Sequence, residues 1–154
     1  MFLSALGVDF LFNAGLLAHF YVHPGAVLLP PQQLVRRIPF GYASILLTLG
    51  FELWLLLRIE IRGTAAGTAF GAVLGAVLGI AGGLGLFSLT PLGPGFLAGV
   101  ALCQFVEYTV AGALAGTAIE SRRVGKVIAL GFAILIAGAA CSAAIQALSR
   151  PAIR

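Results

Sequence analysis

Six glycines at a strict spacing of four residues are the feature that most constrains the fold of this chain. They are Gly63, Gly67, Gly71, Gly75, Gly79 and Gly83. No charged residue occurs from residue 63 to residue 89, and about 20 apolar residues suffice for a helix to cross a hydrocarbon core of about 30 Å. In lipid, glycines four apart form a groove in which a second helix packs backbone to backbone. The sequence therefore predicts a transmembrane helix over 64–89, a glycine-zipper helix that packs closely through Gly67, Gly71, Gly75 and Gly79.

The geometry of this row suggests more than one neighbour. Four residues at about 100° each displace every glycine by about 40° around the helix from the one before. A straight partner then reaches about three consecutive glycines, because the row turns away from it. We expect the Gly63 end and the Gly83 end to face different helices, with this helix in the middle of a bundle or of an oligomer.

The composition places the whole chain in a membrane. Of its 154 residues, 60% are hydrophobic and 9% charged, whereas soluble domains carry about 25% charged residues. We therefore predict a single polytopic membrane domain over 1–154, typical of a bacterial inner membrane. The net charge of +4 arises from arginines near the ends of apolar segments, which favours lipid headgroups, and no basic run with aromatics indicates nucleic-acid binding.

The apolar segments divide the chain into an all-α bundle of about five transmembrane helices. The predicted spans are 2–22, 40–59, 64–89, 95–119 and 127–148. The first span contains Asp9 and Asn13, so whether it crosses fully stays open, and without a basic leader region it is not expected to be a cleaved signal peptide. The short connection between the second and third spans predicts an antiparallel hairpin. A short helix over 31–38 is expected to lie in the interface, with Arg36 and Arg37 at the headgroups.

The orientation in the membrane is not decided by charge. Five spans would leave five basic residues on the side of the N-terminus: Arg58, Arg62, Arg122, Arg123 and Lys126. The opposite side would carry four: Arg36, Arg37, Arg150 and Arg154. The positive-inside rule compares these counts, and a difference of one leaves both orientations open.

Three carboxylates inside the predicted spans are the candidate functional residues. A charge at the centre of a transmembrane helix costs about 2.5–3.5 kcal/mol on insertion scales, so such residues normally face the protein interior and are functional candidates. Glu107 lies near the middle of the fourth span, with Cys103, Gln104 and Tyr108 on its side of the helix. Asp9, one helical turn from Asn13, and Glu52 are predicted to lie at a common depth, with Glu107 deeper.

These acids also have a structural interpretation, in which a protonated carboxyl group donates a hydrogen bond between helices.

Cys103 and Cys141 lie in apolar segments without a CxxC spacing, so we expect two buried thiols and no disulfide or zinc site. His19 and His23 are four apart but have no further ligand nearby in sequence, which favours residues at the interface over a metal site. The sequence contains no motif of a catalytic or cofactor site, so neither an enzyme nor a bound cofactor or metal is expected.

Two functions remain open from the sequence. The first is a small transporter or channel for a cation, a proton or a protonated solute, in which Glu107 is the central site, Gln104 and Tyr108 orient it, and Asp9 with Asn13 and Glu52 form an access layer. A homo-oligomer or a partner would complete the pathway. The alternative is an accessory or assembly subunit that packs on a larger membrane protein through its glycine-zipper helix.

Overall fold

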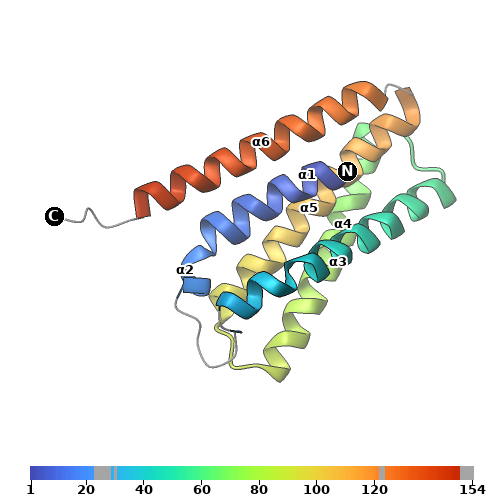
Figure 1. Cartoon of the computed structure of the whole chain (residues 1–154). Helices are drawn as coiled ribbons and strands as arrows, with labels where there is room; N and C mark the ends of the chain where they lie inside the picture. Colours follow the sequence, from blue (N-terminus) through green and yellow to red (C-terminus); the bar gives the residue numbers. More distant parts are fainter. Residues whose placement is uncertain (23–28, 30, 122–123, 150–154) are drawn as a thin grey trace.

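The computed structural model describes residues 1–22, 29, 31–121 and 124–149, and all regular structure within this part is helical (Figure 1). The elements are α1 (Phe2–Asp9), the π-helical segment η1 (Phe10–Leu16), α2 (Ala18–Val22), α3 (Pro31–Arg58), α4 (Thr64–Leu89), α5 (Pro94–Ser121) and α6 (Val124–Ser149). The prediction of an all-α fold is confirmed.

Four of these helices are long and apolar enough to span a membrane, namely α3 from Val35 onward, α4, α5 and α6. The N-terminal helix is shorter: its apolar stretch covers Phe2–Leu16, and a turn at Leu17 separates it from α2. The chain thus has the architecture of a multi-pass membrane protein with four long helices and a short N-terminal one. His23, Arg122, Arg123, Arg150 and Arg154 lie outside the described residues.

Residues 31–38 do not form a separate interfacial helix, which corrects the sequence-based prediction. They are the first turns of α3, which continues through Pro39 to Arg58 without a break. A proline inside a helix removes one hydrogen bond and crowds the preceding turn, but neighbouring groups compensate for this in membrane helices. Arg36 and Arg37 are exposed on these first turns.

The central element is α5, which packs on α4, α1 and α3 and touches α6 (Figure 1). It is the most buried of the four long helices. By contrast, α4 makes its extensive contact with α5 and little with α3. The close antiparallel hairpin expected between the second and third spans is therefore formed by α4 and α5 instead.

The glycine row of α4 lies along α5. Gly67, Gly71, Gly75 and Gly79 are buried, and a Cβ added at Gly67 or Gly71 would collide with a carbonyl oxygen of α5. At Gly79 the added atom would lie 2.7 Å from the carbonyl oxygen of Ala101. The two backbones approach this closely only because these positions lack a side chain.

One neighbour follows the whole row, so the expectation of different helices at its two ends is wrong. The contacts pass along α5 from Gly116, whose carbonyl accepts the Gly63 N–H at 3.0 Å, down to Ala101 beside Gly79. The row of residues four apart is inclined to the helix axis. A partner that crosses at this inclination stays over every glycine, whereas a parallel one would lose contact after about three.

The last helix, α6, lies on the outside of the bundle along α1 and η1 (Figure 1). Small residues again permit the contact, because a Cβ on Gly7 would lie 2.5 Å from the Ile134 carbonyl oxygen and one on Gly138 would collide with the Gly7 backbone. The α1–α6 pair is therefore a second contact of backbone against backbone.

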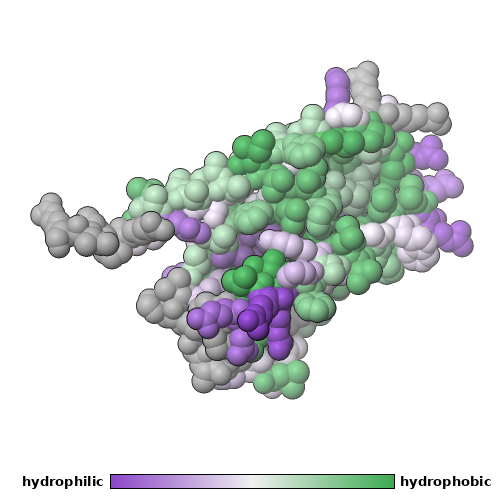
Figure 2. All heavy atoms as spheres, viewed as in Figure 1, coloured by the Kyte–Doolittle hydropathy of each residue, from purple (hydrophilic) through white to green (hydrophobic). Residues whose placement is uncertain are grey.

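Apolar side chains cover most of the visible surface in Figure 2. Hydrophilic residues gather at the end where α3 leads to α4, and near the start of α3. This distribution fits helices surrounded by lipid with their polar ends at the two interfaces. Cys103 is buried, but Cys141 is exposed on the outer side of α6, which corrects the expectation of two buried thiols.

Candidate functional site

The π-helical segment shapes the N-terminal side of the candidate site. The Leu17 N–H bonds to the carbonyl of Phe12, five residues back, at 2.7 Å. The amide of Gln146 on α6 donates to the Ala14 carbonyl at 2.6 Å and so satisfies a backbone group of this segment from outside. Such wide turns interrupt the regular helix and are frequent at functional sites.

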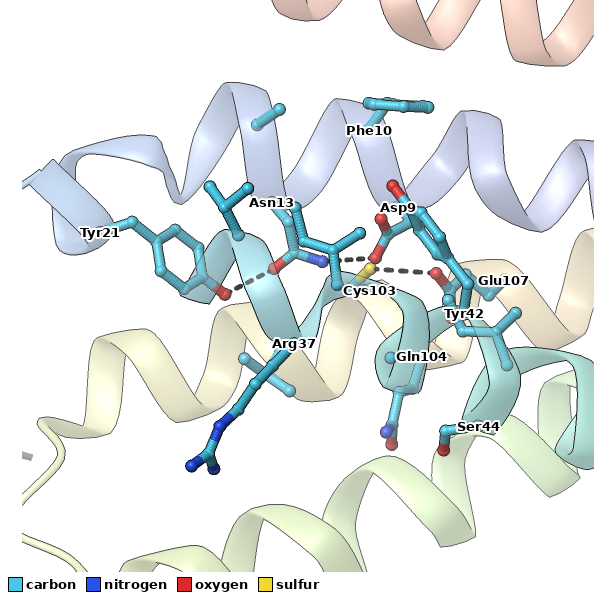
Figure 3. A pocket seen from close by; sticks show the side chains of 16 residues that line it. Asp9, Phe10, Asn13, Tyr21, Arg37, Tyr42, Ser44, Cys103, Gln104 and Glu107 are labelled. Carbon is cyan, nitrogen blue, oxygen red and sulfur yellow. Dashed lines mark hydrogen bonds between the residues drawn. The ribbon is translucent and has the colours of Figure 1, made fainter. Parts of the chain in front are cut away.

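Three polar side chains form a chain of hydrogen bonds on this part of the molecule. The Tyr21 hydroxyl donates to the Asn13 amide oxygen at 2.8 Å, and the Asn13 amide nitrogen donates to Asp9 Oδ1 at 2.7 Å. Figure 3 shows both hydrogen bonds, which connect α2 with the end of α1. Asp9 is thereby held in one orientation by a neutral donor, and no lysine or arginine in the described ranges forms an ion pair with it.

The opposite wall belongs to α5, where Cys103 and Glu107 lie one turn apart on one face. Both side chains are buried, and Glu107 is only 6% exposed. The Cys103 thiol donates to Glu107 Oε1 at 3.6 Å. Asp9 joins them across the α1–α5 contact, and one ligand atom of each of the three residues lies within 4.8 Å of the others.

These residues line an open pocket of about 660 Å³ between α1, η1, α2, α3 and α5. Its other polar lining residues are Asn13, Tyr21, Arg37, Tyr42, Ser44 and Gln104. In Figure 3 the guanidinium of Arg37 points away from Asp9 and Glu107. Among the residues that the structure describes, the acids therefore face the pocket without a cationic partner.

A small apolar cluster lies beside the pocket, and Ile45 both lines the pocket and packs against this cluster. Ala5, Leu49, Tyr108 and Ala111 pack together there, about one helical turn beyond the pocket residues of α1, α3 and α5. Tyr108 therefore belongs to this cluster and does not line the pocket, unlike Gln104. Of the two residues predicted to orient Glu107, only Gln104 lies at the pocket.

Glu52 lies elsewhere, which corrects the prediction that it shares a layer with Asp9. Its side chain is fully buried beside Gly71 and Gly112, where α3 meets the α4–α5 contact. Neither of its carboxylate oxygens has a hydrogen-bond partner among the described residues. Asp9 is instead beside Glu107, the residue expected to lie deeper.

The remaining candidate residues, Arg36, Arg37 and His19, lie outside the group of acids. Arg37 lines the pocket near the start of α3, and Arg36 is exposed beside it. His19 is exposed, with its ring 3.9 Å from that of Phe20, and the pairing with His23 falls outside the described residues.

The spacing of four in the sequence placed Cys103 beside Glu107, but sequence reasoning assigned Cys103 no role in the site. No sequence pattern indicated the π-helical turn or the contact from Gln146, since both depend on how α1 and α6 pack.

Comparison of the chain with protein-family models, with curated proteins and with solved structures yields no match.

Proposed function

We propose that this protein is a small transporter or channel of a bacterial inner membrane that carries a cation, a proton or a protonated solute. The observation that supports this proposal is the pair Asp9 and Glu107, facing an open pocket with no cationic partner in the described part of the chain. In this proposal no cofactor, nucleic acid or enzymatic step takes part.

The energetics of the Asp9–Glu107 pair favour binding of a cation or a proton. One charged side chain at the centre of a membrane helix costs about 2.5–3.5 kcal/mol on insertion scales, and two carboxylates within 4.8 Å of each other also repel. A cation or a proton shared between them relieves both costs. Intramembrane carboxylates in this situation commonly mark proton relays and ion pathways.

The open pocket supplies access to the two acids. Its walls reach Tyr21 on α2 and Val35 and Arg37 in the first turns of α3. The apolar cluster around Ala5 and Tyr108 lies about one helical turn beyond the pocket residues of α1, α3 and α5. Transport through this site requires that the cluster opens or that a second copy completes the path, as in alternating access around a fixed midplane site.

The proposal is tested by flux into liposomes that contain the purified full-length chain. Glu107→Gln should abolish cation-dependent or proton-dependent flux, while the circular dichroism spectrum and the elution volume stay those of the wild type. The matched control is Glu120→Gln, because Glu120 is exposed at the end of the same helix. Equal flux in wild type and Glu107→Gln, or no flux of protons or of any cation in the wild type, would contradict the proposal.

The second candidate is an accessory subunit of a larger membrane protein. It is favoured by the position of α6, which packs on α1 and leaves most of its surface uncovered. Because α5 covers Gly67–Gly79, a partner would have to contact other surfaces, for example the open positions at Gly50 and Gly85. Light scattering in mild detergent distinguishes the two: one stoichiometric larger protein supports the accessory subunit, and a monomer or homo-oligomer supports the transporter.

A further inference from the structure

Asp9, Cys103 and Glu107 form a group of three metal-ligating side chains at the pocket. We infer that this group binds a divalent transition-metal ion of the zinc class, such as Zn²⁺, Co²⁺ or Cd²⁺. The inference deepens the proposed function and rests on it, because it names the class of cation that the site accepts.

The spacing of the ligand atoms fits a tetrahedral ion. With metal–oxygen and metal–sulfur distances of about 2.0 and 2.3 Å, tetrahedral geometry separates an oxygen from a sulfur by about 3.5 Å. The Cys103 Sγ and Glu107 Oε1 atoms are 3.6 Å apart. All three ligand atoms lie within 4.8 Å of one another. Tetrahedral geometry separates two oxygen ligands by about 3.3 Å, so the oxygen of Asp9 needs to approach by about 1.5 Å at most.

The donor types select the class of ion. A thiolate is a soft ligand that favours zinc-like ions, whereas Ca²⁺ takes six to eight oxygens and Mg²⁺ requires an octahedron of them. Three protein ligands with an open fourth position form a zinc site accessible to water or to a moving ion. The pocket provides this fourth position, since all three residues line it.

Two further observations indicate a ligand at this place. Glu107 is more than nine-tenths buried, and its only hydrogen-bond partner among the described residues is the weak thiol donor at 3.6 Å. Asp9 is oriented by the bonds from Tyr21 through Asn13. Outer hydrogen bonds of this kind hold a metal-binding carboxylate in place and are important for affinity.

The proton and the charges involved in metal binding can be accounted for. The Cys103 thiol loses its proton to water in the pocket and becomes the thiolate ligand, because only the thiolate binds the metal. One thiolate and two carboxylates carry three negative charges, and the divalent ion leaves the complex with a net charge of −1. No oxidation or reduction takes place.

The test uses the purified, metal-free, full-length protein in detergent micelles, titrated with Co²⁺. We expect a thiolate-to-cobalt charge-transfer band that saturates at one ion per chain and that Zn²⁺ displaces. Cys103→Ser should abolish the band, and Cys141→Ser should leave it unchanged, because Cys141 is exposed on α6 outside the pocket. Asn13→Leu should weaken Co²⁺ affinity about 10–100-fold, because it removes an outer hydrogen bond.

A missing band, or a band lost in Cys141→Ser and kept in Cys103→Ser, overturns the inference. Circular dichroism of each variant distinguishes loss of the ligand from loss of the fold. This result can be distinguished from that of the flux assay. Proton or cation flux without a thiolate band would refute the metal site and still support the proposed transporter. A thiolate band without any flux would support the metal site and refute transport.

Discussion

Adding one methyl group at Gly75 tests the close contact between α4 and α5. In Gly75→Ala the new Cβ would lie 2.9 Å from Phe105 Cα and 3.0 Å from Tyr108 Cβ, while carbon atoms pack best at about 3.5–4.0 Å. The helices must therefore separate by about 0.5 Å or more. Overpacking of this kind destabilises a protein by about 1–3 kcal/mol.

Gly50→Ala is the matched control, because a Cβ at Gly50 meets no atom of the described residues within 4 Å. Both changes place alanine inside a helix and gain the same intrinsic propensity of about 1 kcal/mol. The difference between the two variants therefore isolates the packing contact. For a chain of this size, 1–3 kcal/mol corresponds to roughly 2–12 °C in the unfolding midpoint, with Gly75→Ala the less stable.

The assay is thermal unfolding in mild detergent, followed by a thiol-reactive dye. In a Cys141→Ser background the remaining thiol is that of Cys103, which is buried in the folded protein and becomes reactive on unfolding. Equal midpoints for Gly75→Ala and Gly50→Ala, or a higher midpoint for Gly75→Ala, would refute the backbone contact between α4 and α5.

Two further changes are measured by the same unfolding assay. Glu52→Met should raise stability by about 1–3 kcal/mol, because it removes a fully buried carboxyl group without hydrogen-bond partners in the described structure. Exposed Glu120→Met should change stability by about 0.5 kcal/mol at most, and a loss in Glu52→Met would mean that this carboxyl group has a favourable partner. Gln146→Ala should lower stability by about 0.5–1.5 kcal/mol through loss of the 2.6 Å bond to Ala14. Ser149→Ala is its control, since that hydroxyl donates to the Ile145 carbonyl within α6. Equal midpoints would show that the bond from Gln146 contributes nothing.

The sequence predicted the features that depend on one helix at a time. The all-α architecture and the long apolar helices follow from hydropathy, because the length of a membrane helix is set by the thickness of the bilayer. Pairs on one helix followed from spacing as well: Asn13 lies one turn after Asp9 and bonds to it. The same rule gives Cys103 beside Glu107, although its chemical meaning was not recognised from spacing alone.

Features that depend on two helices were not accessible in this way. Counting residues from a helix end gives depth in the membrane, and on that basis Asp9 was assigned to the layer of Glu52. Depth leaves open both the rotation of a helix about its axis and the identity of its neighbour. In the structure α1 turns Asp9 toward Glu107 on α5, while Glu52 faces the glycine contact beside Gly71.

The sequence by itself thus determined that this chain forms long apolar helices, that one of them carries a row of glycines, and that acids lie within the spans. Only the tertiary structure decided which helix covers the glycines and which acids meet. The physical reason is that hydropathy and local spacing act along a single helix, and an apolar helix in lipid is almost equally hydrophobic on every side. The choice of neighbour then depends on close packing at small residues and on a few polar contacts between helices.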